Sequence, residues 1–211
     1  MAVTWDDLRI ACLQKMFSLD GEVLVKDSTT TPYINMMPAA ANEAMHILLT
    51  AGRQFKKCLA VKNDGEKGEP LGKWLAYDLK ELAADFYALD VIYYTDGTEY
   101  RTFSDYRMEG ERYLLLPADM AGSFRVWYDS YPPVLTVVTP GTQEIDLHPE
   151  EMTMVALYMA GQLYKDDDVS IAQIYMNEWT TWLEELKQSA RRAKGKNNGS
   201  GGGWTSVKGW T

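Results

Sequence analysis

The chain has 211 residues, of which 46% are hydrophobic, so it can bury a sizeable core in one large domain or two small ones. The net charge is −9, and residues 191–211 contribute five cations and no acid, which leaves −14 on residues 1–190. An acidic body disfavours binding to nucleic acid, and there is no apolar run of about 18 residues that would predict a membrane span.

The first 57 residues are predicted to be helical. Thr4 precedes two aspartates and is a good N-cap for a helix over residues 5–17. A polar connection follows, in which proline is expected to hold Thr31 in an extended conformation. A second helix with one apolar face is predicted over residues 36–53.

Residues 58–147 are predicted to form a β-rich insertion. Two runs of β-forming residues, 91–95 and 99–103, flank Asp96-Gly97, which is typical of a hairpin turn. Further strands are expected at 112–116, 122–128 and 134–138, with another candidate at 142–147. Short strands at this spacing favour a small antiparallel sandwich or barrel.

Residues 148–190 are predicted to form a helical hairpin that packs with residues 1–57. Pro149 suits the first position of one helix, and Asp168 is a credible N-cap for the next. Apolar residues recur in both helices at spacings of three and four, which predicts one buried face. The residues assigned to hairpin packing are Leu163, Tyr164, Asp168, Ala172, Tyr175, Trp179 and Leu183.

Residues 191–211 are predicted to be a flexible tail. A basic stretch leads into a glycine-rich linker and two Gly-Trp-Thr triplets. Exposed indole rings are costly in water, so docking of the tail onto a partner is expected, against the alternative of an unconstrained terminus. The residues assigned to docking are Arg191, Arg192, Lys194, Lys196, Trp204, Lys208 and Trp210.

The sequence offers little material for catalysis or cofactor binding. Its two histidines, His46 and His148, are far apart, and the familiar nucleophile, phosphate-binding and zinc motifs are absent. The acidic run at 166–168 favours a solvated turn over a metal site because it lacks the spacing of a calcium loop. Cys12 and Cys58 each lie among apolar neighbours and are expected to be buried free thiols in a reducing cytoplasm. We therefore expect no catalytic residue, metal or cofactor.

The predicted hairpin resembles a known family. The runs Leu-Tyr-Met-Ala at 157–160, Gln-Leu-Tyr-Lys-Asp-Asp-Asp at 162–168 and Tyr-Met-Asn-Glu-Trp at 175–179 resemble the C-terminal helical hairpin of head-to-tail connector (adaptor) proteins of tailed bacteriophages. The passage over 128–147 resembles the strand and loop that precede that hairpin. The resemblance is best over about residues 90–186.

The resemblance implies a structural protein, and with the predicted elements it gives an α+β fold: a helical bundle with an inserted small antiparallel β-sandwich or barrel. The flexible C-terminal tail is predicted from composition and is not part of the resemblance. Such adaptors form a ring, usually of twelve copies, beneath the portal protein, where they extend the DNA channel and contact tail or stopper proteins. Double-stranded DNA would pass without specific binding, and the location would be the virion neck, after assembly in the bacterial cytoplasm. The tail would insert Trp204 and Trp210 into an apolar pocket of the portal.

Two alternatives stay open. The first is a carbohydrate-binding or adhesion module that uses the aromatic residues of the β region, although such residues more often form cross-strand pairs and core. These residues are Tyr93, Tyr94, Tyr100, Tyr106, Tyr113, Trp127, Tyr128 and Tyr131. The second is a small hydrolase with paired carboxylates, drawn from Asp85, Asp90, Asp96 or Asp105, although no spacing singles out a pair.

Overall fold

The computed structural model describes residues 2–17, 23–24, 26–65 and 67–197, and the side chains only as far as residue 190. Over these ranges the fold is mixed α+β, with five helices and antiparallel sheets, as the sequence predicted. The chain divides into two compact units, one of Met1–Arg53 with Thr136–Thr211 and one of Gln54–Leu135. No helix in the described ranges has both the length and the apolar composition needed to cross a membrane.

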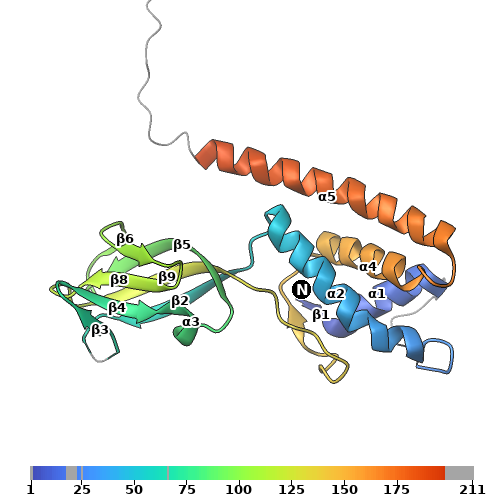
Figure 1. Ribbon diagram of the computed structural model, residues 1–211, viewed down its shortest axis with the longest axis horizontal. Helices are drawn as coiled ribbons and strands as arrows, with labels where there is room; N and C mark the ends of the chain where they lie inside the picture. Colours follow the sequence, from blue (N-terminus) through green and yellow to red (C-terminus); the bar gives the residue numbers. More distant parts are fainter. Residues whose placement is uncertain (1, 18–22, 25, 66, 198–211) are drawn as a thin grey trace, which may run out of the picture. The chain divides into compact units, whose positions relative to one another are not determined.

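The first unit is a group of helices centred on α4 (Figure 1). Its elements are β1 (Val3–Thr4), α1 (Trp5–Phe17), α2 (Thr31–Ala51), β10 (Glu144–Ile145), α4 (Pro149–Leu163) and α5 (Val169–Asn197). Helix α4 contacts α1, α2 and α5, and every residue from Met154 to Gly161 is buried. A helix that is covered on all sides forms the core of its unit, which explains the long apolar run in this part of the sequence.

The sequence signals predicted at the start of three helices are confirmed. The Asp7 N–H donates to Thr4 Oγ1 at 3.2 Å, and the Asp7 carboxylate accepts the Thr4 N–H at 2.8 Å, so Thr4 caps α1. Pro149 is the first residue of α4. The Asp168 carboxylate accepts the N–H groups of Ser170 and Ile171 at 2.9 and 3.1 Å and thereby caps α5.

Helix α2 begins earlier than predicted. It starts at Thr31 rather than at about residue 36, and the expectation of an extended Thr31 is wrong. Pro32 lies in the first turn, where its missing N–H has no helical partner to lose. The turn before the helix is held by Asp27, whose carboxylate accepts the N–H groups of Thr29 and Thr30, both at 2.8 Å. At the other end Gly52, with φ of 109°, terminates the helix.

The second unit consists of two four-stranded antiparallel sheets and a short helix. One sheet has the order β2-β9-β5-β6 and the other β3-β4-β8-β7. The elements are β2 (Lys56–Lys62), β3 (Glu69–Leu71), β4 (Trp74–Asp78), α3 (Leu79–Leu82), β5 (Phe86–Thr95), β6 (Tyr100–Phe103), β7 (Arg107–Glu109), β8 (Tyr113–Pro117) and β9 (Ser123–Ser130). Buried side chains from both sheets form one hydrophobic cluster, which includes Leu75, Ile92, Leu116, Phe124 and Val126.

The predicted hairpin is confirmed as the β5–β6 pair, with Asp96-Gly97 in its turn. The Asp96 carboxylate accepts the N–H groups of Thr98 and Glu99 at 2.8 and 3.0 Å. Gly97 has φ of 99°, a conformation that residues with a Cβ rarely adopt.

The strand predicted at 134–138 is wrong, because these residues lie in loop and turn. Of the candidate at 142–147, only Glu144–Ile145 forms a strand, and it pairs with β1 in the helical unit. The β-rich unit therefore spans Gln54–Leu135 rather than 58–147. The two prolines at 132–133 lack the N–H groups that a sheet requires, and they precede the return of the chain to the helices.

Candidate assembly surface

The residues assigned to hairpin packing lie along the α4–α5 contact and its turn. Leu163, Ala172 and Trp179 are buried, whereas Tyr164, Tyr175 and Leu183 are half-buried and Asp168 is exposed at its capping position. The ring centroid of Trp179 lies 5.0 Å from that of Tyr158 on α4. These side chains therefore fix how α5 lies on the central helix.

A glycine allows the two helices of the hairpin to approach closely. A Cβ atom at Gly161 of α4 would lie 2.9 Å from Met176 Sδ and 3.4 Å from the Ala172 carbonyl oxygen of α5. Distances below 3.0 Å require the neighbouring atoms to shift. The lack of a side chain at this position thus sets the separation of the helices.

Two tyrosines of the hairpin hold the end of α1. The Tyr175 hydroxyl donates to the Lys15 carbonyl oxygen at 2.6 Å, and the Tyr164 hydroxyl donates to that of Met16. The last carbonyl groups of a helix have no helical partner, so these bonds satisfy acceptors that would otherwise need water. Burial raises the pKa of both tyrosines, which keeps the hydroxyl groups protonated as donors.

Arg53 links the end of α2 to the start of α4. Its Nε lies 2.6 Å from Glu151 Oε1, and its Nη2 donates to the Asp146 carbonyl oxygen at 3.0 Å. Glu151 also accepts the N–H of His148 at 2.8 Å. The first turn of α4 is therefore held by an ion pair and by charge-assisted hydrogen bonds.

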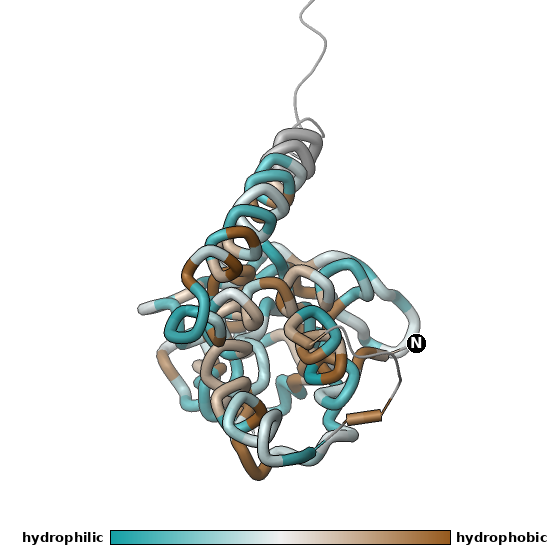
Figure 2. Tube along the Cα trace, turned by 90° about the vertical axis from the view of Figure 1, so that its right-hand side faces the viewer, coloured by the Kyte–Doolittle hydropathy of each residue, from teal (hydrophilic) through white to brown (hydrophobic). Residues whose placement is uncertain are grey.

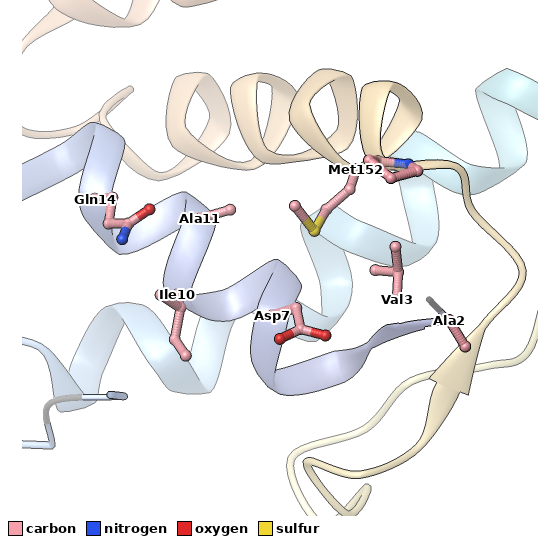
Figure 3. A pocket seen from close by; sticks show the side chains of 8 residues that line it. Ala2, Val3, Asp7, Ile10, Ala11, Gln14 and Met152 are labelled. Carbon is pink, nitrogen blue, oxygen red and sulfur yellow. The ribbon is translucent and has the colours of Figure 1, made fainter. Parts of the chain in front are cut away.

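Two grooves flank this first turn, and Pro149 lines both. The α1–α4 groove measures about 450 Å³ and is lined by Ala2, Val3, Asp7, Ile10, Ala11, Gln14, Pro149 and Met152. Figure 3 shows Met152 extending from α4 toward α1. The groove is mostly apolar, with Asp7 and Gln14 as its polar residues.

The α4–α5 groove, of about 570 Å³, is more acidic. Trp182, Leu186 and Met154 provide its apolar surface, and Glu150, Glu151 and Glu185 lie among its lining residues. Helix α5 also exposes Val169 and Ile174, and hydrophilic and hydrophobic positions alternate along it in Figure 2. At 1.5 Å per residue, α5 with its 29 residues is roughly 20 Å longer than α4 with its 15 residues.

The outer face of the β2-β9-β5-β6 sheet carries several of the predicted aromatic residues. Trp127 pairs in register with Cys58 and Val91, and the Tyr93 and Tyr100 rings are stacked with centroids 5.0 Å apart. Trp127 and Tyr100 are exposed, whereas Tyr94 and Tyr128 belong to the core. Cys58 is exposed on this face, so its predicted burial is wrong, while the buried free thiol predicted at Cys12 is confirmed.

The residues assigned to tail docking lie largely outside the described structure. The backbone of α5 continues to Asn197, so the helix includes positions 191–196, but the side chains of Arg191, Arg192, Lys194 and Lys196 are outside the described residues. Trp204, Lys208 and Trp210 are outside them altogether. The change of composition predicts that the helical hairpin ends at residue 190, whereas α5 continues to Asn197.

No cluster of three or more potential metal ligands occurs in the described part of the chain. In the acidic turn, the Asp167 carboxylate accepts a hydrogen bond from the hydroxyl of Tyr33, which lies at the start of α2. This hydrogen bond raises the pKa of Tyr33. This hydrogen bond links the turn between α4 and α5 to the start of α2. Sequence reasoning missed this bond, the two tyrosine caps and both grooves, because each depends on how separate helices meet.

No protein-family model matches the sequence, and the search of curated proteins gives no match.

Proposed function

We propose that the protein is a head-to-tail adaptor of a tailed bacteriophage: a structural ring protein in the virion neck that joins the portal to the tail. The observation that carries the proposal is that the sequence runs resembling adaptors lie in α4, in α5 and in the turn between them, and that α4 is the central helix of its unit. The finer architecture that we propose is a helical bundle with an inserted antiparallel β-sandwich.

The α1–α4 and α4–α5 grooves would serve contacts between neighbouring copies. A ring requires two different, complementary surfaces on each copy, so that the head-to-tail contacts close on themselves. The first groove is apolar and the second has acidic residues beside Trp182 and Leu186, so the two would accept different elements. The β unit would contact tail or stopper proteins.

The charge of the chain supports a channel role. Residues 1–190 carry −14, and an acidic inner wall would repel the phosphates of DNA that passes through the ring. The basic tail would dock on the portal, with its tryptophans in an apolar pocket. Assembly would take place in the cytoplasm of the host bacterium.

Electron microscopy of the purified protein, alone and mixed with the portal protein of the same virus, tests the proposal. We expect twelve-fold rings in the mixture, with a channel along the ring axis. A protein that remains monomeric beside assembled portal would contradict it. A groove variant, Trp182→Arg, should prevent ring formation without unfolding the chain, because Trp182 is 37% exposed.

A carbohydrate-binding or adhesion function is the second candidate, and the exposed Trp127 and the Tyr93–Tyr100 stack favour it. Aromatic faces of this kind can stack against the apolar faces of sugars. A glycan array probed with the full chain and with Trp127→Ala distinguishes the two functions. Binding that the substitution removes would favour this candidate.

A further inference from the structure

A small polar cavity in the helical unit has a buried cation in its wall. It measures about 220 Å³ and lies between the start of α1, the first turns of α2 and residues 136–137. Arg9, Lys26 and Asn35 supply polar groups, and Trp5 and Ile34 supply apolar surface. Since a water molecule occupies about 30 Å³, a cavity of this size suits a compact ion with some water.

The Arg9 guanidinium is incompletely paired. Arg9 is only 7% exposed, and its Nε is buried without a hydrogen-bond partner among the described residues. The charged end lies 5.2 Å from the Trp5 ring centroid, and its Nη2 is paired with the Asp6 carboxylate. A buried N–H without a partner costs free energy unless a ligand or water accepts its hydrogen.

The other donors around the cavity are available. Within the described chain, Lys26 has no ion-pair partner and Asn35 has no side-chain hydrogen bond. Asp27 follows Lys26 in the sequence, and its carboxylate accepts hydrogen bonds from the N–H groups of Thr29 and Thr30. The Thr31 hydroxyl donates to a backbone oxygen, so it can only accept from a ligand. Among the lining residues Arg9 and Lys26 are cationic and none is acidic, and Arg9 is paired with Asp6.

We propose that this cavity binds a compact oxyanion, either phosphate or a small carboxylate. The oxyanion would accept hydrogen bonds from Arg9 Nε and the Asn35 amide, and Lys26 would supply the second positive charge. Guanidinium forks match both planar carboxylates and phosphates, whereas a lysine acts as a point charge. The site is independent of the adaptor function, so each proposal can fail without the other.

NMR titration of the full ¹⁵N-labelled chain at constant ionic strength tests the site. Sodium phosphate and sodium acetate are the probes, and sodium chloride is the reference. We expect saturable shifts of the Arg9 Nε–H and Trp5 indole N–H signals with phosphate, with acetate or with both, and none with chloride. The probe that saturates identifies the type of anion. Absence of saturation with either probe, or equal shifts with chloride, would overturn the proposal.

Variants of exposed residues separate a specific site from general charge effects. Lys26→Ala and Asn35→Ala should each weaken binding by about tenfold, because each removes a donor to a charged ligand. Lys165→Ala is the matched control, since it removes the same charge from an exposed position of the same unit. Equal affinities for Lys26→Ala and Lys165→Ala would refute the assignment. Circular dichroism establishes that each variant is folded.

Discussion

At the residue scale, the hydroxyl groups of Tyr164 and Tyr175 are the most directly testable contacts. Each donates to a carbonyl group at the end of α1 that has no helical partner. We expect Tyr164→Phe and Tyr175→Phe each to lower the free energy of unfolding by about 1 kcal/mol, the usual contribution of one hydrogen bond. Urea denaturation monitored by circular dichroism measures the change.

Tyr100→Phe is the matched control for these substitutions. Tyr100 is 61% exposed, and its hydroxyl makes no hydrogen bond within the described structure, so its loss should leave stability unchanged.

The rings of Tyr164 and Tyr175 are stacked with centroids 6.2 Å apart. The double variant should therefore depart from additivity, and stability equal to wild type in both single variants would disprove the role of the hydroxyls.

Asp96 gives a pH prediction in the β5–β6 turn. Hydrogen bonds from the N–H groups of Glu99 and Thr98 lower the pKa of its carboxyl from 3.8 to about 2. Because the pKa is depressed in the folded state, the stabilisation is present above pH 3.8 and is lost as the pH falls toward 2. NMR titration of the Asp96 side-chain carboxyl carbon should give a midpoint near 2.

Asp96→Asn separates the charge from the shape of that turn. The amide oxygen of asparagine can accept the same N–H groups, so the hairpin should persist while the acid titration disappears. A midpoint near the ordinary aspartate value in the wild-type chain would show that the turn hydrogen bonds are not maintained in solution.

At the element scale, the separation of α4 and α5 depends on Gly161. We expect Gly161→Leu to destabilise the protein by about 1–3 kcal/mol, because a branched side chain would meet Met176 and the backbone of Ala172. Gly161→Ala should be nearly neutral, since the flexible end of Met176 can move and alanine gains about 1 kcal/mol of helix propensity. Thermal and urea unfolding compare the two, and equal effects would contradict the close contact.

Elements with a local signal at their start or in their turn could be predicted from the sequence. Helix α4 begins at Pro149 and α5 follows an Asp168 cap, and both signals act within one turn of the chain. The β5–β6 hairpin is likewise encoded by Asp96-Gly97. The start of α2 was missed because proline, which restricts the residue before it, also suits the first turn of a helix.

The strand predicted at residues 134–138 is absent from the structure, which shows that local sequence signals alone do not determine a strand. Residues 134–138 contain three valines, which favour strands, yet Val134, Val137 and Val138 are 79%, 62% and 88% exposed. A strand also needs a neighbouring backbone to bond, and the chain here returns to the helical unit. The pairing of Val3 with Ile145 is the reverse case, in which two short segments far apart in sequence form a strand pair.

At the scale of the whole molecule, helix patterning predicted which residues pack but not the surfaces that result. The apolar spacing in α4 predicted one buried face, whereas every residue from Met154 to Gly161 is buried, and the grooves beside Pro149 depend on how α1 and α5 lie against α4. The orphaned Nε of Arg9 likewise has no sequence signal. Sites formed by tertiary geometry therefore required the structure.

The adaptor proposal assigns the C-terminal tail to a contact with the portal. Deletion of residues 195–211 removes both Gly-Trp-Thr triplets and two lysines, Lys196 and Lys208. We expect this deletion to abolish portal binding and to leave the thermal unfolding of the chain unchanged, since a tether adds affinity without enlarging the folded body. Sedimentation velocity of the mixture with portal measures binding, and differential scanning calorimetry measures folding.

Two full-length variants separate the indole rings from the charges. Trp204→Ala with Trp210→Ala should weaken portal binding strongly at every salt concentration, because buried indole rings dominate such contacts. Lys196→Ala with Lys208→Ala should weaken it chiefly at low salt, since exposed charges are screened as ionic strength rises. Undiminished binding by the deletion variant would remove the tail from the proposed joint. Loss of binding only with the lysine variant would leave electrostatic attraction as the tail's contribution.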